Sequence, residues 1–200
     1  MAVILASQSP RRRELLERMG ISDFLIRPAQ GEEIFDPSLT PAQLVETLSR
    51  QKAEEISAGA GPADVVIAAD TVVAVDGQVL GKPGDEAEAA EMLAALSGRE
   101  HTVYTGVTVR RGGETVTEHE ATAVRFRPLT GEEIADYVAT GEPMDKAGAY
   151  GIQGYGCLLV EGLSGDYFNV VGLPVCRLGK ILARFGVEPL RLAAEKERRA

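Results

Sequence analysis

Three consecutive arginines open a predicted helix directly after a short apolar strand. Arg11, Arg12 and Arg13 occupy the first turn, where the helix dipole is already positive and each cation costs about 0.3 to 1 kcal/mol. A bound phosphate would offset this cost, because it accepts hydrogen bonds from free backbone amides and from arginine side chains together. Ser7-Gln8-Ser9 precede the helix and add small polar donors. Compensation by Glu14 and by solvent screening is the alternative explanation.

Lys52 is a second candidate for binding an anion. Residues 41–57 predict a helix whose apolar side chains form one arc, namely Leu44, Val45, Leu48, Ala53 and Ile56. Lys52 falls near the centre of that arc. Either its stem lies on the core while the ammonium reaches water, or the ammonium meets a phosphate. Lys82, in Gly81-Lys82-Pro83, and Lys146 are further candidate cations, and each alone is a weak signal.

Asp70 is the principal candidate carboxylate. It follows the segment 64–69, which is apolar from Val65 to Ala69 and predicts a strand buried on both faces and ending at Asp70-Thr71. Open α/β sheets bind ligands at the carboxyl ends of such strands, although a cap or a turn is the alternative role. Glu32 and Glu33 are candidates to join Asp70 in holding Mg²⁺, which takes one or two carboxylates plus phosphate oxygens. As a bare acidic pair, such residues are more often simply exposed to solvent.

A glycine-rich segment, residues 145–154, holds the side chain best suited to reading a nucleobase. Its sequence is Asp-Lys-Ala-Gly-Ala-Tyr-Gly-Ile-Gln-Gly. The Gln153 amide both donates and accepts hydrogen bonds, so it is able to read the edge of a nucleobase. The alternative is a structural loop whose glycines relieve backbone strain.

Several familiar chemistries lack their motifs. The chain has no G-x-x-x-x-G-K-[ST] phosphate loop, no G-x-G-x-x-G opening a helix and no nucleophile elbow. His101 and His119 lie in strand-like segments, which disfavours a serine or cysteine triad. Carboxylates, cations and amide donors remain, and this inventory suits metal-assisted phosphoryl chemistry.

Strand and helix signals alternate along the chain and must position these residues. Strands are predicted over residues 2–6, 64–69, 102–110, 115–126 and 157–160, with a hairpin turn at Gly112-Gly113. Helices are predicted to begin at Ser9-Pro10, Thr40-Pro41, Asp85, Thr130 and Pro174, and the first four are expected to end near Gly20, Ser57, Gly98 and Gly141. We therefore expect an α/β protein with a mixed central β-sheet flanked by helices.

Composition places the chain among acidic proteins with a well-developed core. Its 200 residues are 44% hydrophobic and carry a net charge of -9, so we expect one domain over residues 1–200, with a charged tail at 190–200. The negative charge disfavours binding to nucleic acid or to anionic membranes. The first apolar run is too short for a signal peptide, so we expect a cytoplasmic protein. Cys157 and Cys176 lie in apolar segments and are expected to be reduced core residues.

Together these blocks resemble the Maf family of nucleotide pyrophosphatases. The resemblance extends over nearly the whole chain and is specific because the blocks occur in order. They are Ala6 to Arg12, Ala69-Asp70-Thr71, Gly81-Lys82-Pro83, Leu96-Ser97-Gly98, Asp145 to Gly154 and Asn169 to Pro174.

This resemblance implies a fold similar to inosine triphosphate pyrophosphatases, with the active site in a cleft between two lobes, and a homodimer. It implies cleavage of nucleoside triphosphates between the α and β phosphates with a divalent metal ion, Mg²⁺ or Mn²⁺. By position, Asp70 matches the proton acceptor and Glu33 a metal or catalytic carboxylate. The matching phosphate-binding set is Ser7, Arg11, Arg12, Lys52 and Lys82.

The loop 145–154 resembles the branch of the family that acts on dTTP and UTP. Arg11, Thr71 and Gln153 match the specificity positions of that branch. The segment Gln30-Gly31-Glu32-Glu33 departs from the family pattern, so whether Glu32 or Glu33 faces the metal stays open. Two other functions remain as alternatives: a nucleotide-binding regulator of septum formation, and a pyrophosphatase for modified purine triphosphates.

Overall fold

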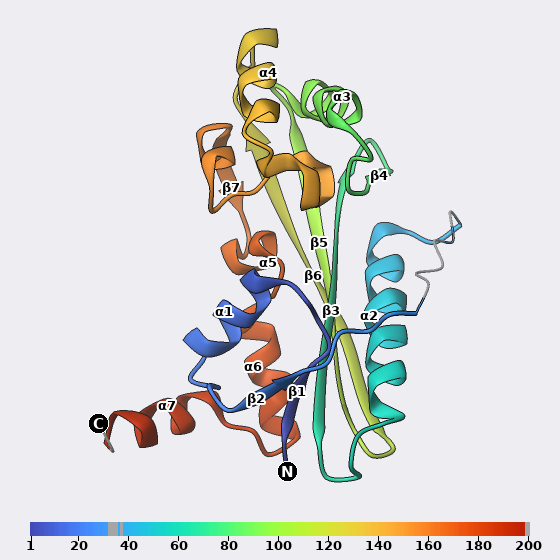
Figure 1. Ribbon diagram of the computed structural model, residues 1–200, viewed down its shortest axis with the longest axis vertical. Coiled ribbons are helices and arrows are strands. Elements are labelled where there is room, and N and C mark those ends of the chain that lie inside the picture. Colours follow the sequence, from blue (N-terminus) through green and yellow to red (C-terminus); the bar gives the residue numbers. More distant parts are fainter. Residues whose placement is uncertain (32–35, 37, 199–200) are drawn as a thin grey trace. The chain divides into compact units, whose positions relative to one another are not determined.

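The structure is a computed structural model that describes residues 1–31, 36 and 38–198. Within these residues, the strands are β1 (Val3–Leu5), β2 (Phe24–Ile26), β3 (Val65–Val75), β4 (Gln78–Leu80), β5 (Glu100–Arg111), β6 (Glu114–Phe126) and β7 (Val160–Ser164) (Figure 1). The α-helices are α1 (Pro10–Arg18), α2 (Pro41–Ser57), α3 (Glu86–Leu96), α4 (Gly131–Ala139), α5 (Tyr167–Val171), α6 (Val175–Arg184) and α7 (Pro189–Glu197). Short 3-10 helices are η1 (Glu142–Asp145), η2 (Ala147–Ala149) and η3 (Tyr155–Leu158).

The described strands form one mixed sheet of seven strands. Its order is β2-β1-β3-β5-β6-β7, with β4 paired to β3. β1 runs parallel to both β2 and β3, whereas β4 and β7 run antiparallel to their partners β3 and β6. The expected α/β fold with a mixed central sheet flanked by helices is therefore confirmed.

The end predicted for the strand 64–69, at Asp70-Thr71, is wrong, because the observed strand β3 continues to Val75. Residues 72–75 are apolar and mostly β-branched, so they extend the same buried strand. The strand ends instead at Asp76 and Gly77, whose φ angles of 51° and 77° make a tight two-residue turn into β4. Asp70 consequently lies inside a long strand and not at its end.

The chain divides into two compact units. The first unit contains Met1–Asp70, Thr105–Glu120 and Gly172–Ala200. Within it, α2 lies on one side of the strands, and α1 and α6 lie on the other (Figure 1). Ser9 caps α1 and a Thr40–Gln43 capping box begins α2, as their sequences predict. A small apolar cluster of Ile4, Ala6, Ala53, Val66 and Ala68 packs α2 against β1 and β3.

The second unit contains Thr71–Tyr104 and Ala121–Val171. Its core includes α3, which contacts α4, and an aromatic group in which Phe126, His101 and Tyr150 meet edge to face. Asp85 caps α3, and a Thr130–Glu133 capping box begins α4, as predicted.

Two predictions near the carboxyl end of the chain are wrong. Residues 155–158 form η3, and the strand begins only at Val160, because the Cys157 and Leu159 amides donate to the Gly154 and Gly156 carbonyls within this turn and are not available to a strand. Cys157 and Cys176 are exposed, because apolar neighbours in sequence do not decide which face of a helix a residue occupies. Residues 190–197 of the predicted charged tail lie in α7. No helix among the described residues is long and apolar enough to span a membrane.

Candidate active site

The turn from β1 to α1 brings the first predicted phosphate-binding residues to one edge of the sheet. β1 pairs with β3 up to Leu5 and Ile67, and the Ala6 amide donates to the Ile67 carbonyl at 2.8 Å. Ser7 therefore follows the carboxyl end of the parallel pair. Asp70 lies three residues beyond Ile67 on β3, at the same edge. Asp70 thus lies just beyond the parallel pairing of β1 and β3, where open α/β sheets bind ligands, although β3 itself continues.

Arg12 folds back over the amino end of α1. Its Nη1 donates to Ser7 Oγ at 3.3 Å and its Nε donates to the Gly172 carbonyl at 2.8 Å. Ser7 is 8% exposed, and its Oγ also accepts from the Ser9 amide at 3.2 Å. These contacts fix the guanidinium beside the helix terminus, where the dipole favours an anion.

The three arginines divide into different roles. Arg13 is exposed and binds Glu17 at 3.1 Å along the helix surface. Glu14, the residue proposed to compensate the first turn, binds Arg18 at 2.6 Å. No acidic residue lies in the first turn of α1. Arg11 and Arg12 are partly buried, so of the three arginines these two remain the candidates for binding a phosphate.

Lys52 points inward from α2, as its place on the apolar arc predicts, and forms an ion pair with Asp70. The Lys52 and Asp70 side chains are 17% and 11% exposed. The structure therefore gives the ammonium a carboxylate partner, in place of the water-exposed position that the alternative predicts. Ion pairs of this kind add little net stability over apolar packing.

The Asp70 carboxylate fits the requirements of a metal ligand. Lys52 binds its Oδ1, whereas its second oxygen makes no hydrogen bond within the part of the chain that the structure describes. One free carboxylate oxygen is compatible with Mg²⁺, which completes its shell with phosphate oxygens and water. Glu32 and Glu33 lie outside the described residues. Among the residues described, no group of three His, Cys, Asp or Glu side chains forms a metal-binding cluster.

The remaining predicted site residues belong to the second unit. Thr71 is partly buried on β3. Lys82 and Gln153 are exposed, and neither side chain makes a hydrogen bond or an ion pair with any residue between 1–31 or 38–198. The Gly148 amide donates to the Gly81 carbonyl at 3.0 Å, which joins the segment carrying Lys82 to the glycine-rich loop. Lys82 and Gln153 are thus both available to a ligand.

Gly148 makes that junction possible. Its φ is 68°, in the left-handed region, and an added Cβ would lie 2.7 Å from Val73 Cγ2. Only glycine combines this backbone conformation with so close an approach.

Lys146 is not a free cation, because its Nζ donates to the Glu142 carbonyl and to Asp145 Oδ1, both at 2.6 Å. Sequence reasoning also missed Glu142. Its carboxylate accepts hydrogen bonds from the Tyr137 hydroxyl and from the Tyr155 and Gly156 amides at the start of η3. A single glutamate in a turn carries no pattern that would have revealed these partners.

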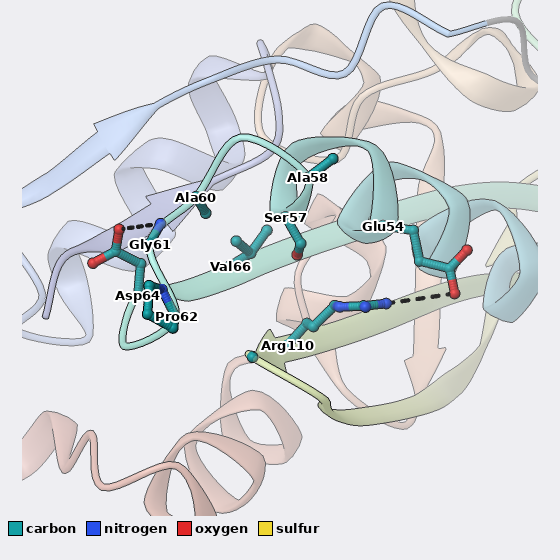
Figure 2. A pocket seen from close by; sticks show the side chains of 10 residues that line it. Glu54, Ser57, Ala58, Ala60, Gly61, Pro62, Asp64, Val66 and Arg110 are labelled. Atoms are coloured by element: carbon teal, nitrogen blue, oxygen red, sulfur yellow. Dashed lines mark hydrogen bonds and ion pairs between the residues drawn. The ribbon is translucent and has the colours of Figure 1, made fainter.

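A separate cavity of about 440 Å³ lies in the first unit, beside the carboxyl end of α2 and the amino end of β3 (Figure 2). Ser57, Asp64, Val66 and Arg110 are among its lining residues, and Arg110 Nη1 lies 3.7 Å from Glu54 Oε1. None of the predicted site residues lines it.

Comparison with known proteins identifies the family. Residues 2–185 match the family of Maf-like proteins, and the chain therefore belongs to that family. The match covers Ser7, Arg11, Arg12, Lys52, Asp70, Thr71, Lys82 and Gln153.

Curated relatives resemble the chain along almost its whole length. A protein of Moorella thermoacetica named dTTP/UTP pyrophosphatase is 57% identical over 189 residues, which cover 93% of this chain and 96% of that protein. Proteins with the same name from Symbiobacterium thermophilum and Bacillus pumilus are 53% and 51% identical, over 92% and 94% of this chain and over 94% and 98% of their own lengths.

Solved structures match less closely. A HAM1 protein from Coxiella burnetii has a TM-score of 0.47 at 15% identity, over 92% of this chain and 99% of that chain. A nucleoside-triphosphatase / dITP/XTP pyrophosphatase from Mycobacterium abscessus has a TM-score of 0.42 at 18% identity, over 64% of this chain and 76% of that chain.

Proposed function

We propose that this protein hydrolyses dTTP and UTP between the α and β phosphates, releasing the nucleoside monophosphate and pyrophosphate. The observation that carries the proposal is the 57% identity, over 93% of the chain, to a protein named dTTP/UTP pyrophosphatase. The residues predicted to carry the chemistry all fall inside the matched region. Their types, carboxylate, ammonium, guanidinium and amide, suit phosphoryl chemistry.

Asp70 acts as the proton acceptor for a water molecule that attacks the α phosphate. The bond from the α phosphorus to the bridging oxygen breaks, and the pyrophosphate leaves with that oxygen. Lys52, Arg11 and Arg12 offset the negative charge that builds on the leaving group, with Ser7 and Lys82 as further phosphate ligands. The Lys52 contact holds the Asp70 carboxylate in a fixed orientation before substrate binds.

A divalent ion, Mg²⁺ or Mn²⁺, is the proposed cofactor, with Asp70 and Glu33 as its protein ligands. When bound, it would neutralise phosphate charge and lower the pKa of a bound water molecule. The free oxygen of Asp70 supports this assignment.

Gln153 reads the base, and Thr71 is a second specificity residue. The exposed Gln153 amide has no competing partner among the described residues, so it is free to pair with the edge of uracil or thymine. The proposed cellular role is removal of unwanted or modified pyrimidine triphosphates in the cytoplasm, by a homodimer.

Pyrophosphate release from dTTP, UTP, CTP and the purine triphosphates tests this function. We expect dTTP and UTP to lead in kcat/KM, and Gln153→Ala to narrow the gap between UTP and CTP. Asp70→Asn serves as the catalytic control and should lower turnover by about 100-fold or more, because it removes the base. Preference for purines would indicate a purine-directed enzyme, and binding without turnover would favour a regulatory role.

A further inference from the structure

The segment from Gly151 to Gly156 is anchored at both ends by two side chains outside it. At one end, the Gly151 amide donates to the Tyr137 hydroxyl at 3.1 Å. At the other end, the Tyr155 amide donates to Glu142 Oε2 at 2.8 Å and the Gly156 amide donates to Glu142 Oε1 at 3.0 Å. The Tyr137 hydroxyl itself donates to Glu142 Oε1 at 2.8 Å, so the two anchors are one connected network.

The glycines of this segment are placed where the anchors come closest. A Cβ at Gly154 would lie 2.1 Å from Glu142 Oε2. A Cβ at Gly156 would lie 2.7 Å from both the Tyr137 hydroxyl and the Gly151 carbonyl oxygen. Because Gly156 meets backbone as well as side chain, the segment cannot simply relax around a larger residue. The absence of a side chain at Gly154 and Gly156 therefore leaves room for the Glu142 carboxylate and the Tyr137 hydroxyl.

Gln153 occupies the tip of the anchored segment. Its side chain is exposed and makes no hydrogen bond to any described residue, so the backbone sets only the position and direction from which the side chain starts. That backbone conformation is held by the bonds of Tyr137 and Glu142 on either side. Fixing the backbone that carries a reading group before the ligand arrives lowers the ordering cost that binding must supply.

We propose that Glu142, together with Tyr137, is a positioning residue for base selectivity, which preorganises the segment 151–156 so that Gln153 meets a uracil or thymine edge. This inference rests on the proposed dTTP and UTP pyrophosphatase function. Glu142 itself does not touch the base in this account, and it acts through Gln153.

The ionised form of Glu142 is the one that holds the segment. Burial opposes ionisation, but the hydrogen bonds from the Gly156 and Tyr155 amides and from Tyr137, and the nearby Lys146 charge, outweigh it and lower the pKa of Glu142. A carboxylate offers acceptors on both oxygens, as these three donors require. Glutamine keeps the shape of the side chain but has a donor in place of one acceptor, so it cannot satisfy all three.

A coupling experiment tests this role. The ratio of kcat/KM for UTP to that for CTP is measured in the parent, Glu142→Gln, Gln153→Ala and the double variant. We expect Glu142→Gln to lower the ratio at least about fivefold, mainly through a higher KM for UTP. In the Gln153→Ala background, Glu142→Gln should change the ratio no further, because the group through which it acts is gone.

Glu133→Gln is the matched control. Glu133 is also an anchoring carboxylate of the second unit, which accepts from the Thr130 amide at 2.8 Å and binds Arg127, but it lies in the capping box of α4. It should lower the melting temperature without changing the UTP to CTP ratio. Tyr137→Phe removes the hydroxyl of the other anchor and keeps the ring. It should also lower the UTP to CTP ratio, and it takes the place of Glu142→Gln in the test if that variant does not fold.

Three results would overturn the inference: a ratio unchanged in both Glu142→Gln and Tyr137→Phe, an equal further drop in the Gln153→Ala background, or an equal drop in Glu133→Gln. Each of these leaves the pyrophosphatase function standing, because the parent still releases pyrophosphate from UTP. A parent that hydrolyses neither UTP nor dTTP would instead refute the proposed function, and the positioning role with it.

Discussion

At the scale of single residues, the ion pair of Lys52 and Asp70 joins a helix to the central strand. The side chains are 17% and 11% exposed, so water screens them only partly. Taking two charges out of water costs free energy, and their attraction repays the cost only while both partners are present. Each residue therefore depends on the other for its stability in the folded protein.

Removing one partner of the Lys52–Asp70 ion pair should lower the free energy of unfolding more than removing both partners. We expect Lys52→Met to lower the free energy of unfolding by about 1 to 3 kcal/mol, because Asp70 is left charged and largely buried. Adding Asp70→Asn to Lys52→Met should recover part of this loss. Urea denaturation of the two single variants and the double variant measures the coupling, and strictly additive losses would contradict it.

His101 is a buried histidine whose ionisation is linked to folding. It is 2% exposed, its Nε2 lies 2.8 Å from the Tyr150 hydroxyl, and its Nδ1 has no hydrogen-bond partner in the described residues. Burial lowers the pKa of His101 to about 4. The folded protein thus holds it neutral, whereas the unfolded chain protonates it near its ordinary pKa of about 6.5.

Stability should therefore fall as the pH drops from about 6.5 towards 4, because the unfolded state binds more protons in that window. Between pH 7 and pH 5, His101 alone should remove about 2 kcal/mol from the free energy of unfolding. His101→Gln keeps a group able to bond Tyr150 but does not titrate, so its stability should depend less on pH. Equal pH dependence in both proteins, measured by urea denaturation, would contradict this prediction.

Among the candidate site residues, those set by local pattern could be predicted from the sequence. Lys52 was placed on the inward face of its helix by spacing alone, and Ser9 was identified as the cap of α1. The Asp70 partner of Lys52 and the anchoring role of Glu142 could not be predicted. Both depend on contacts between segments that are distant in the chain or bent by turns, which periodicity does not encode.

At the scale of elements, the close packing of α2 on the sheet determines where Lys52 lies. A Cβ at Gly106 of β5 would lie 2.1 Å from the Val45 carbonyl oxygen, in the backbone of α2. The backbones of α2 and β5 cannot move aside as a flexible side chain could. The helix can therefore approach the strand only because residue 106 has no side chain.

Gly106→Ala should lower the free energy of unfolding by more than about 2 kcal/mol, because α2 must move away from β5. It should also weaken activity by shifting Lys52. Gly113→Ala is the matched control: it lies in the turn after β5 with nothing within 4 Å of an added Cβ, so its effect should stay below about 1 kcal/mol. Thermal and urea unfolding compare the two, and similar losses would refute the packing argument.

The starts of α1, α2, α3, α4 and α6 and, to within one residue, the ends of β5 and β6 agree with the sequence prediction, whereas the end of β3 and the start of β7 do not. Caps such as Thr40 and Asp85 are local signals and act within one turn of the helix that they begin. The length of β3 depends on its antiparallel partner β4, and the turn η3 that precedes β7 begins at the Tyr155 and Gly156 amides, which bind Glu142. Partners of this kind are supplied by the tertiary structure.

At the scale of the whole molecule, a protein with a net charge of -9 is proposed to bind a highly anionic nucleotide. Its overall field repels such a ligand, so binding must come from local cations, helix termini and a metal ion. The candidate groups are distributed over both compact units, with Ser7, Arg12, Lys52 and Asp70 in the first and Thr71, Lys82 and Gln153 in the second.

The bond that is cleaved tests the central proposal most directly. UTP is hydrolysed in water labelled with the heavy isotope of oxygen, and the products are separated and weighed by mass spectrometry. We predict equimolar UMP and pyrophosphate, with the label in UMP, because water attacks the α phosphorus. Release of UDP and orthophosphate, or label in the pyrophosphate, would contradict the account.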